Sequence, residues 1–402
     1  MACYDQRRYG SQATIGAFFA SLRLVDGLVD GETESRSQIV VNVRMPSITD
    51  IPCELVASIL RSLDDFETLT SALLTCRHIY SSFKQIPGTE LAILRGRIGL
   101  DLLPYSVASL DASRLEPSPG DESSFCGLLD LLYDDPSQLV ARTASMPPEL
   151  LRNLSRKHDW VTTLALNCRK AVGLSSSEYS RFCRAFYRVD LFYVLFGAVG
   201  NFNTGFGEGN LLLHRHPPWE NEQLGCVHDF IKAKYQEASS DVFAYNAPFD
   251  EYQTDYFTTG GNNIMIQIWL SHGLDFLRRL MSTDSHESKR VLLVSAINAG
   301  WTHLPEALVC IMDSHAYNST NLEDMSTSEL TTIIPAYENI CNTDKGPYAG
   351  WYAANTSVQP LFWVYRLENR WLRRRAYVFW DWVYVREPDV LKLFATTSDE
   401  DD

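Results

Sequence analysis

The chain lacks a long apolar run, a close pair of cysteines and any excess of positive charge. Its longest strongly apolar stretch, LFYVLFGAV at 191–199, is far shorter than the roughly 20 residues that cross a bilayer. The nine cysteines include no Cys-x-x-Cys pair, and their odd number fits no closed set of disulfides. We therefore expect free thiols in a reducing compartment, cytoplasmic or nuclear, and no membrane partner.

Basic residues are outnumbered by acidic ones. The chain has 35 Lys and Arg residues against 50 Asp and Glu residues, which gives a formal net charge of -15. Because the averaged field repels phosphate backbones, nucleic acid is not expected as a main partner.

Recognisable catalytic and repeat motifs are missing as well. The sequence contains no G-x-S-x-G, H-E-x-x-H, kinase or EF-hand signature, and no WD, kelch, leucine-rich, ankyrin or tetratricopeptide repeat. The glycine-rich GNFNTGFGEGN at 200–210 lacks the Lys-Ser/Thr ending of a P-loop, so we interpret it as a turn. These absences favour a non-enzymatic protein without a cofactor.

One short stretch gathers residue types that can bind zinc: His214, His216, Cys226 and His228. Their spacing matches no zinc finger that we can name. We interpret the histidines as surface and capping residues and expect no metal.

The composition predicts a globular chain, because 45% of its residues are apolar and 12% are aromatic. A length of 402 residues exceeds what one core usually supports, so a small module and a larger domain are expected. We place a flexible leader at 1–44, a module at 45–95, a linker region at 96–124 around LEPSPGDESS, a helical domain at 125–395 and an acidic tail at 396–402.

Helical spacing dominates the larger domain. Ser175 and Glu178 form a predicted capping box, and apolar residues then recur every three or four positions, at Tyr179, Phe182, Phe186 and Val189. The segment 262–281 continues the pattern, and further helices are expected at 148–171, 219–237, 287–297, 328–341 and 371–393. Since alternating strand patterns are scarce, the fold is expected to be mainly α.

The module at 45–95 carries the most regular apolar spacing. Asp50 is the expected N-cap of a first helix, with Pro52 in its first turn. The apolar face of that helix comprises Leu55, Val56, Ile59, Leu60 and Leu63. Asp64 and Asp65 restart the chain before a second series: Phe66, Leu69, Leu73, Cys76, Tyr80 and Phe83. The module should therefore be a helical hairpin or a three-helix unit, which is marginally stable by itself.

These residues resemble an F-box. The family pattern opens with Leu-Pro-x-Glu-Leu, and this chain has Ile51-Pro52-Cys53-Glu54-Leu55. A paired apolar step and a leucine follow, as Ile59-Leu60-Arg61-Ser62-Leu63, and then spaced leucines and a Cys-Arg pair, as Leu69, Leu73 and Cys76-Arg77. The match covers residues 48–86, and it departs from the family at Ile79-Tyr80, where a Trp is frequent.

The resemblance implies that the module binds the Skp-type adaptor of a Skp, cullin and F-box ubiquitin ligase. Its implied binding residues are Ile51, Pro52, Glu54, Leu55, Ile59, Leu60, Leu63, Leu69, Leu73, Cys76 and Arg77. The alternative is that the apolar residues are the internal core of a helical bundle.

The C-terminal region combines tryptophans with arginines. Arg366, Arg370 and Arg373 would share one face of a continuous helix and could receive an acidic or phosphorylated target segment. In the alternative, which we favour, the aromatic rings fill the core and the arginine stems lie across them in ion pairs. The stretch RRRAYVFWDW also resembles the tail of some fungal F-box proteins.

The sequence thus favours a substrate receptor, with an adaptor on the module and an unidentified protein target on the helical domain. Two other interpretations stay open. The protein could bind the adaptor outside a ligase, or its helical domain could hold an enzyme pocket around His214, His228 or the aromatic-rich tail.

Overall fold

The structure is a computed structural model, and it describes residues 48–115, 122–168, 174–197, 211–244, 264–297, 303–310, 326, 328, 344–355, 364–366 and 369–387. Within these ranges the chain forms helices and no strand, which confirms the mainly α prediction. The described helices form two compact units, one from the described residues of 48–99 and 143–155 and one from those of 100–142 and 156–387. No helix in the described ranges has the length and apolar character to span a membrane.

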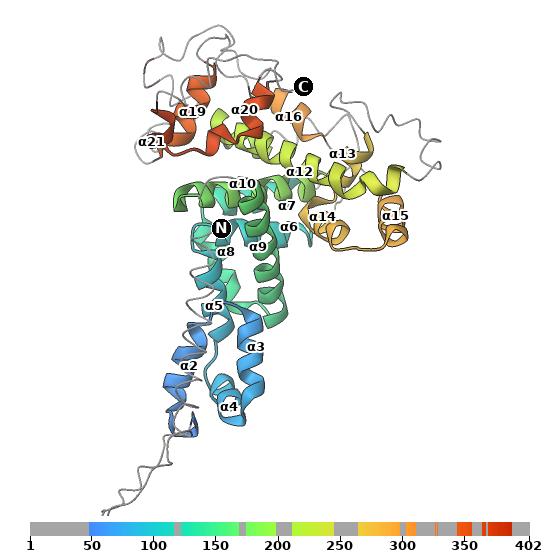
Figure 1. Ribbon diagram of the computed structural model, residues 1–402. Coiled ribbons are helices and arrows are strands. Elements are labelled where there is room, and N and C mark those ends of the chain that lie inside the picture. Colours follow the sequence, from blue (N-terminus) through green and yellow to red (C-terminus); the bar gives the residue numbers. More distant parts are fainter. Residues whose placement is uncertain are drawn as a thin grey trace, which may run out of the picture. The chain divides into compact units, whose positions relative to one another are not determined.

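The first unit contains a sequence of short helices (Figure 1). They are η1 (Ile48–Asp50), α2 (Cys53–Arg61), α3 (Phe66–Thr75), α4 (Arg77–Gln85), α5 (Thr89–Ile98), η2 (Thr143–Ser145) and the first part of α9 (Pro148–Cys168). Helix α4 packs against both α2 and α3, and α5 packs against α2. The module is therefore of the three-helix type, extended by α5.

Local backbone and capping features mark the boundaries of α2, α3 and α4. The Asp65 carboxylate accepts a 2.6 Å hydrogen bond from the Thr68 backbone N–H, which confirms the expected restart before α3. The prediction for Asp50 is wrong, because Asp50 ends the 3-10 turn η1 and Pro52 is the N-cap residue of α2. Cys76 has extended backbone angles, φ -157° and ψ 155°, and so separates α3 from α4.

Long-range polar contacts join the ends of the first unit's helices. Arg61 donates to the Pro87 carbonyl at 3.1 Å, and Arg97 donates to the Asp64 carbonyl at 2.8 Å. Arg152 in the 143–155 segment forms a 2.9 Å ion pair with Glu90. The unit is thus discontinuous in sequence.

The second unit is built around α10 (Ser176–Phe196), which is buried on nearly all sides. It packs against α6 (Leu103–Ala112), α12 (Pro218–Ala244) and α14 (Gly273–Met281). The capping box of α10 is confirmed by hydrogen bonds of 3.1 Å from the Glu178 N–H to Ser175 and 3.2 Å from the Ser175 N–H to Glu178. A helix that is buried around most of its circumference lies at the centre of a domain, although α10 also buries charged side chains such as Arg181, Arg188 and Asp190.

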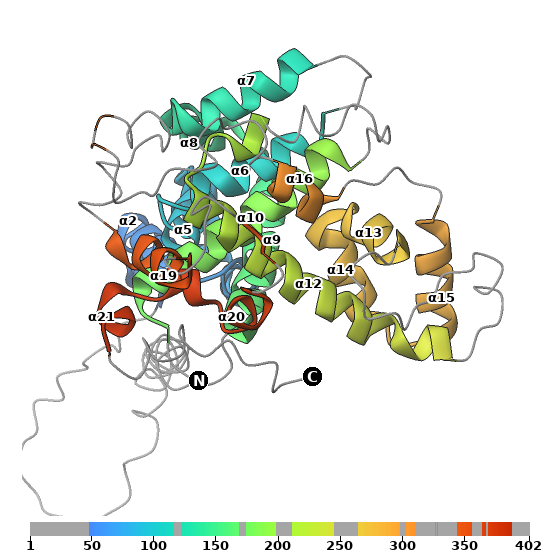
Figure 2. The ribbon, with the colours of Figure 1, turned by 90° about the horizontal axis from the view of Figure 1, so that it is seen from above.

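The remaining helices of the second unit pack against α10, α12 or the helices next to them. They are α7 (Glu122–Tyr133), α8 (Pro136–Arg142), the rest of α9, α13 (Ile264–Leu270), α15 (His286–Ser295), α16 (Leu304–Cys310), α19 (Lys345–Asn355), α20 (Arg370–Arg374), η6 (Tyr377–Phe379) and α21 (Trp382–Val385). In Figure 2, α12 runs from α19 and α20 toward α13, α14 and α15, all of which it contacts. The predicted helices at 148–171, 219–237 and 287–297 therefore correspond to α9, α12 and α15.

Three sequence predictions need correction. The region 96–124, expected as a linker, contains α6, whose Leu103 and Val107 are fully buried in the second unit. The pattern at 262–281 is two helices, because Gly273 adopts φ 73° and a Cβ there would approach the Asp190 carboxylate to 2.8 Å. The helix expected at 371–393 is broken by Ala376, at φ 54°. The predictions for 1–44, 200–210, 328–341 and the acidic tail fall outside the continuous described ranges.

Candidate functional site

Helix α2 presents an apolar face to solvent. Leu55 and Ile59, one helical turn apart, are 57% and 45% exposed, whereas their neighbours Val56 and Leu60 are 4% and 3% exposed. Pro52, which precedes the helix, is exposed as well. We call Pro52, Leu55 and Ile59 the α2 face. A contiguous patch of exposed large apolar side chains is typical of a binding site.

The other predicted binding residues have different positions. Leu60, Leu63 and Leu69 are buried in the core of the first unit, so their prediction as direct partner contacts is corrected. Ile51, Leu73 and Cys76 are half-buried, and Glu54 and Arg77 are exposed. Helical spacing could not separate these groups, because both the buried and the exposed residues of α2 recur every three or four positions.

Two more exposed apolar side chains lie on the same unit. Leu74 on α3 is 82% exposed and Tyr80 on α4 is 48% exposed. Tyr80 belongs to the sequence pattern, whereas Leu74 does not, since it lies one position beyond the regular spacing at Leu73. An apolar residue out of phase with its helix is the signal that could have identified it.

Arg366, Arg370 and Arg373 do not form the exposed basic stripe that a continuous helix would give. Arg373 and Arg366 are buried, and Arg370 is exposed. The Arg373 Nε donates to Asp229 at 2.8 Å, and its Nη1 donates to the Arg366 carbonyl at 2.6 Å. Arg373 therefore follows the alternative that the sequence analysis favoured, in which arginine side chains lie across buried aromatic rings and form ion pairs.

Tyr365 completes the cluster around Arg373. Its ring lies 4.2 Å from the Arg373 guanidinium, and its hydroxyl donates to Asp229. Burial disfavours the charged form of Arg373 and would lower its pKa. The negative charges of Glu222 and Asp229 have the larger combined effect, so the pKa of Arg373 is raised. Burial raises the pKa of Glu222 against the opposing effect of Arg373, whereas for Asp229 the effect of Arg373 prevails and the pKa is lowered. The cluster is an internal ionic network of the second unit.

The histidines considered for zinc are separated. His214 is exposed, and Cys226 and His228 are buried on α12. Burial lowers the pKa of His228 to about 3, so it is neutral, and it contacts the Tyr193 hydroxyl at 2.7 Å. Within the described ranges, no three His, Cys, Asp or Glu side chains lie close enough to hold a metal ion.

His216 belongs to a chain of polar side chains in the second unit. It contacts the Tyr133 hydroxyl at 2.8 Å through Nε2 and Glu220 at 3.3 Å through Nδ1. Burial lowers the pKa of His216 to about 4 and raises that of Tyr133, so the phenol stays protonated and donates to the neutral imidazole. Arg188 pairs with the same Glu220 at 2.7 Å. Such a network can fix helix positions, but a protonated tyrosine is a poor nucleophile.

Comparison of the chain with protein-family models, with curated proteins and with solved structures finds no match. The functional assignment consequently depends on the α2 face and on the motif that surrounds it.

Proposed function

We propose that the chain is the substrate-receptor subunit of a ubiquitin ligase of the Skp, cullin and F-box type. Its first unit would bind the adaptor through the α2 face, and its second unit would bind a protein target. The observation that carries the proposal is the exposure of Leu55 and Ile59, directly beside core residues of the same short helix and within the Pro-x-Glu-Leu and Ile-Leu elements of the motif.

The energetics suit a partner interface. Full burial of a leucine or isoleucine side chain contributes roughly 1.5–3 kcal/mol, and about half of each α2-face side chain is still exposed. Burying both against a partner therefore contributes about 2 kcal/mol, which corresponds to roughly a thirtyfold gain in affinity. Glu54 and Arg77 are exposed and would contribute polar contacts at the rim of the interface.

A receptor of this kind needs no nucleophile of its own. Holding a target near a conjugating enzyme raises the effective concentration of the target's lysines, and this positioning is the contribution to the reaction. The network of Tyr133, His216 and Glu220 then serves to hold helices together.

The adaptor proposal is tested with the double substitution Leu55→Asp and Ile59→Asp in the full-length chain. Both side chains point to solvent, so the variant should fold, while two carboxylates placed against an apolar partner surface should abolish adaptor pull-down. The matched control is Val291→Asp with Val294→Asp on α15, whose side chains are 56% and 42% exposed. Unchanged pull-down by the folded α2-face variant, or equal loss in the control, rejects the proposal.

Co-purification of a cullin separates a ligase subunit from a protein that binds the adaptor outside a ligase. We expect the wild-type chain to recover adaptor and cullin together, and the α2-face variant to lose both. Recovery of adaptor without cullin would favour the protein that acts outside a ligase.

A further inference from the structure

Ser62 lies at the end of α2, next to the α2 face. It is the C-cap residue of the helix, with φ -88° and ψ 2°, and it is exposed. Its hydroxyl donates a 2.8 Å hydrogen bond to the carbonyl of Ile59, which belongs to the α2 face. Because α2 has only nine residues, this bond supports a large part of the helix. A chemical change at the Ser62 hydroxyl would therefore act on the α2 face.

The residues that follow Ser62 are rich in carboxylates. Asp64, Asp65 and Glu67 occupy the second, third and fifth positions after it. Asp64 and Glu67 are exposed, and the half-buried Asp65 caps α3. Ser62 and the two aspartates lie in the connection between α2 and α3, which is anchored in the core by Leu63. An exposed serine followed by carboxylates offers an acceptor hydroxyl and a recognition element for an enzyme with a basic cleft.

A second helix ends with the same geometry but with different neighbours. Ser282 follows the nine-residue helix α14, has φ -89° and ψ 0°, and is exposed. Its hydroxyl donates to the Arg279 carbonyl at 3.1 Å. Carboxylates stand at the second and fifth positions after it, as they do after Ser62, but the third position is Ser285. Ser282 is therefore a matched reference for the effect of Asp65.

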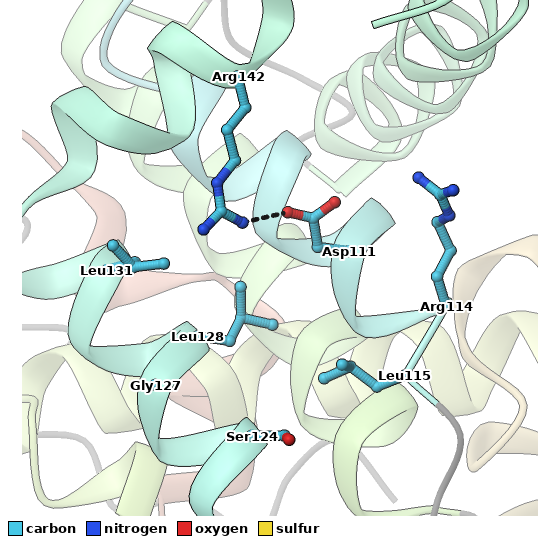
Figure 3. Close-up of a pocket in the computed structure, with 8 residues that line it drawn as sticks. All are labelled: Asp111, Arg114, Leu115, Ser124, Gly127, Leu128, Leu131 and Arg142. Carbon is cyan, nitrogen blue, oxygen red and sulfur yellow. Dashed lines mark hydrogen bonds and ion pairs between the residues drawn. The ribbon is translucent and has the colours of Figure 1, made fainter. Parts of the chain in front are cut away.

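Ser113, which ends α6, gives a further comparison. It is exposed, and its hydroxyl donates to the backbone carbonyl three residues earlier at 2.7 Å. The next residue is Arg114, and Figure 3 shows it on the opposite side of Asp111 from Arg142, which pairs with Asp111 at 3.0 Å. One carboxylate, Glu116, stands at the third position after Ser113. The cation next to the hydroxyl makes Ser113 a poorer match to a basic cleft than Ser62.

We propose that Ser62 is the acceptor of an acid-directed protein kinase, and that its phosphorylation loosens the last turn of α2 and so weakens adaptor binding. In the reaction, the Ser62 Oγ forms a bond to the γ-phosphorus of ATP, and the bond from that phosphorus to ADP breaks. The hydroxyl proton passes to a base of the kinase. The effect on adaptor binding rests on the proposed function, whereas the modification and the loosening do not.

A phosphate on Ser62 opposes the helix in three ways. The phosphorylated oxygen has no proton to donate to the Ile59 carbonyl. The group adds about 1.5 to 2 negative charges at a helix C-terminus, whose carbonyls already carry negative partial charge, and next to acidic residues. The neighbouring Arg61 donates to the Pro87 carbonyl at 3.1 Å, and a phosphate that attracted this guanidinium would break that contact. Each effect loosens the turn that carries Ile59.

The first measurement determines whether Ser62 is modified. The full-length chain without adaptor is incubated with ATP and a kinase of the class that selects a carboxylate three residues after the acceptor, and phosphopeptides are quantified by mass spectrometry. Ser62 should be phosphorylated at least about tenfold faster than Ser113 and Ser282. Asp65→Asn should slow the reaction by about tenfold, since asparagine lacks the charge but still caps α3. A rate no higher than at the other two serines, or unchanged in Asp65→Asn, overturns the proposal.

The second measurement is hydrogen exchange in residues 53–62, and it also needs no adaptor. Exchange in the last turn of α2 should be about tenfold faster in the phosphorylated chain than in the unmodified chain. Ser62→Ala, which removes the hydroxyl hydrogen bond without adding charge, should accelerate exchange less. Equal exchange with and without the phosphate would show that the helix is not loosened and would overturn the proposal.

The third measurement is adaptor affinity. Phosphorylation should raise the dissociation constant by about tenfold, and Ser62→Ala treated with kinase and ATP should bind like the untreated variant. Ser62→Glu should also bind more weakly than the wild type, whereas the matched control Ser282→Glu should not. Equal affinity with and without the phosphate contradicts the regulation. If the unmodified chain fails to bind the adaptor, the proposed function is wrong, and the first two measurements still decide the role of Ser62.

Discussion

The Nε of Arg181 donates a 2.8 Å hydrogen bond to the carboxylate of Asp344, 163 residues later in the chain. The same guanidinium donates to the Phe379 carbonyl at 2.7 Å and pairs with Asp381 at 2.9 Å. Glu178, one turn earlier on α10, accepts a hydrogen bond from the Asp381 N–H at 3.2 Å. The first turns of α10 therefore hold the C-terminal helices of the second unit.

Replacing Arg181 should loosen those helices. We expect Arg181→Met to lower the local free energy of opening by about 3 kcal/mol, because it removes several charge-assisted hydrogen bonds from a buried site. Arg181→Lys should lose part of this, since lysine cannot form the paired contact with Asp344. Hydrogen exchange in residues 344–355 and 377–385 measures the effect. Equal exchange in Arg181→Met and in the exposed control Arg374→Met would contradict it.

The burial pattern of α2 predicts different outcomes for two leucines that lie five positions apart on the same helix. Leu60→Ala should destabilise the first unit by about 3 kcal/mol, because it leaves a cavity in the core. Leu55→Ala should change stability by no more than about 0.5 kcal/mol, because its side chain already faces solvent. Hydrogen exchange in peptides from 48–99 reads the stability of this unit separately. Similar losses in the two variants would show that the α2 face is packed in solution.

Arg373 provides a prediction with a pH signature. Arg373→Met should destabilise the second unit by about 3 kcal/mol near neutral pH, since the carboxylates of Glu222 and Asp229 lose their shared cation. The loss should be smaller at pH 5. Burial already raises the pKa of Glu222, and without Arg373 this carboxyl would take up a proton more readily. Chemical unfolding at pH 5 and pH 8 tests the difference, and a loss that does not depend on pH would exclude this explanation.

Two buried histidines should make the folded protein less stable as the pH falls. The pKa of His216 is lowered from 6.5 to about 4 and that of His228 from 6.5 to about 3, so the unfolded chain binds protons first as the pH falls. Their stabilising contribution is thus fully present above about pH 6.5 and is lost toward pH 4, by at most about 1.4 kcal/mol per pH unit for each histidine.

The measurement is unfolding free energy against pH from 4 to 7.5. His228→Gln should flatten the slope below pH 6.5, whatever its effect on stability at neutral pH, because one titrating group is removed. A variant slope as steep as that of the wild type would show that other groups cause the acid sensitivity.

Local features of the fold could be predicted from the sequence. The capping box at Ser175 and Glu178 and the cap at Asp65 depend on residues three positions apart, so short-range chemistry decides them. The helices α10 and α12 could be located because each is a long segment without proline in its interior, even though each packs against several other helices and so lacks a one-sided apolar pattern.

Features that depend on distant residues could not be predicted. Spacing placed Arg366 and Arg373 on one helix, but Arg366 precedes α20 and Arg373 is oriented by Asp229 on α12. The alternation of Leu55 and Leu60 between solvent and core also requires knowledge of where α4 and α5 pack.

The discontinuity of the first unit has a consequence for how the protein is made. Domains generally fold as units while the chain leaves the ribosome from its N-terminus. Residues 143–155, which supply the Arg152 partner of Glu90, are synthesised only after α6, α7 and α8. The first unit is therefore complete only after more than forty further residues have been synthesised, and we expect truncated chains that end before residue 143 to be poorer binders than the whole protein in adaptor-binding assays.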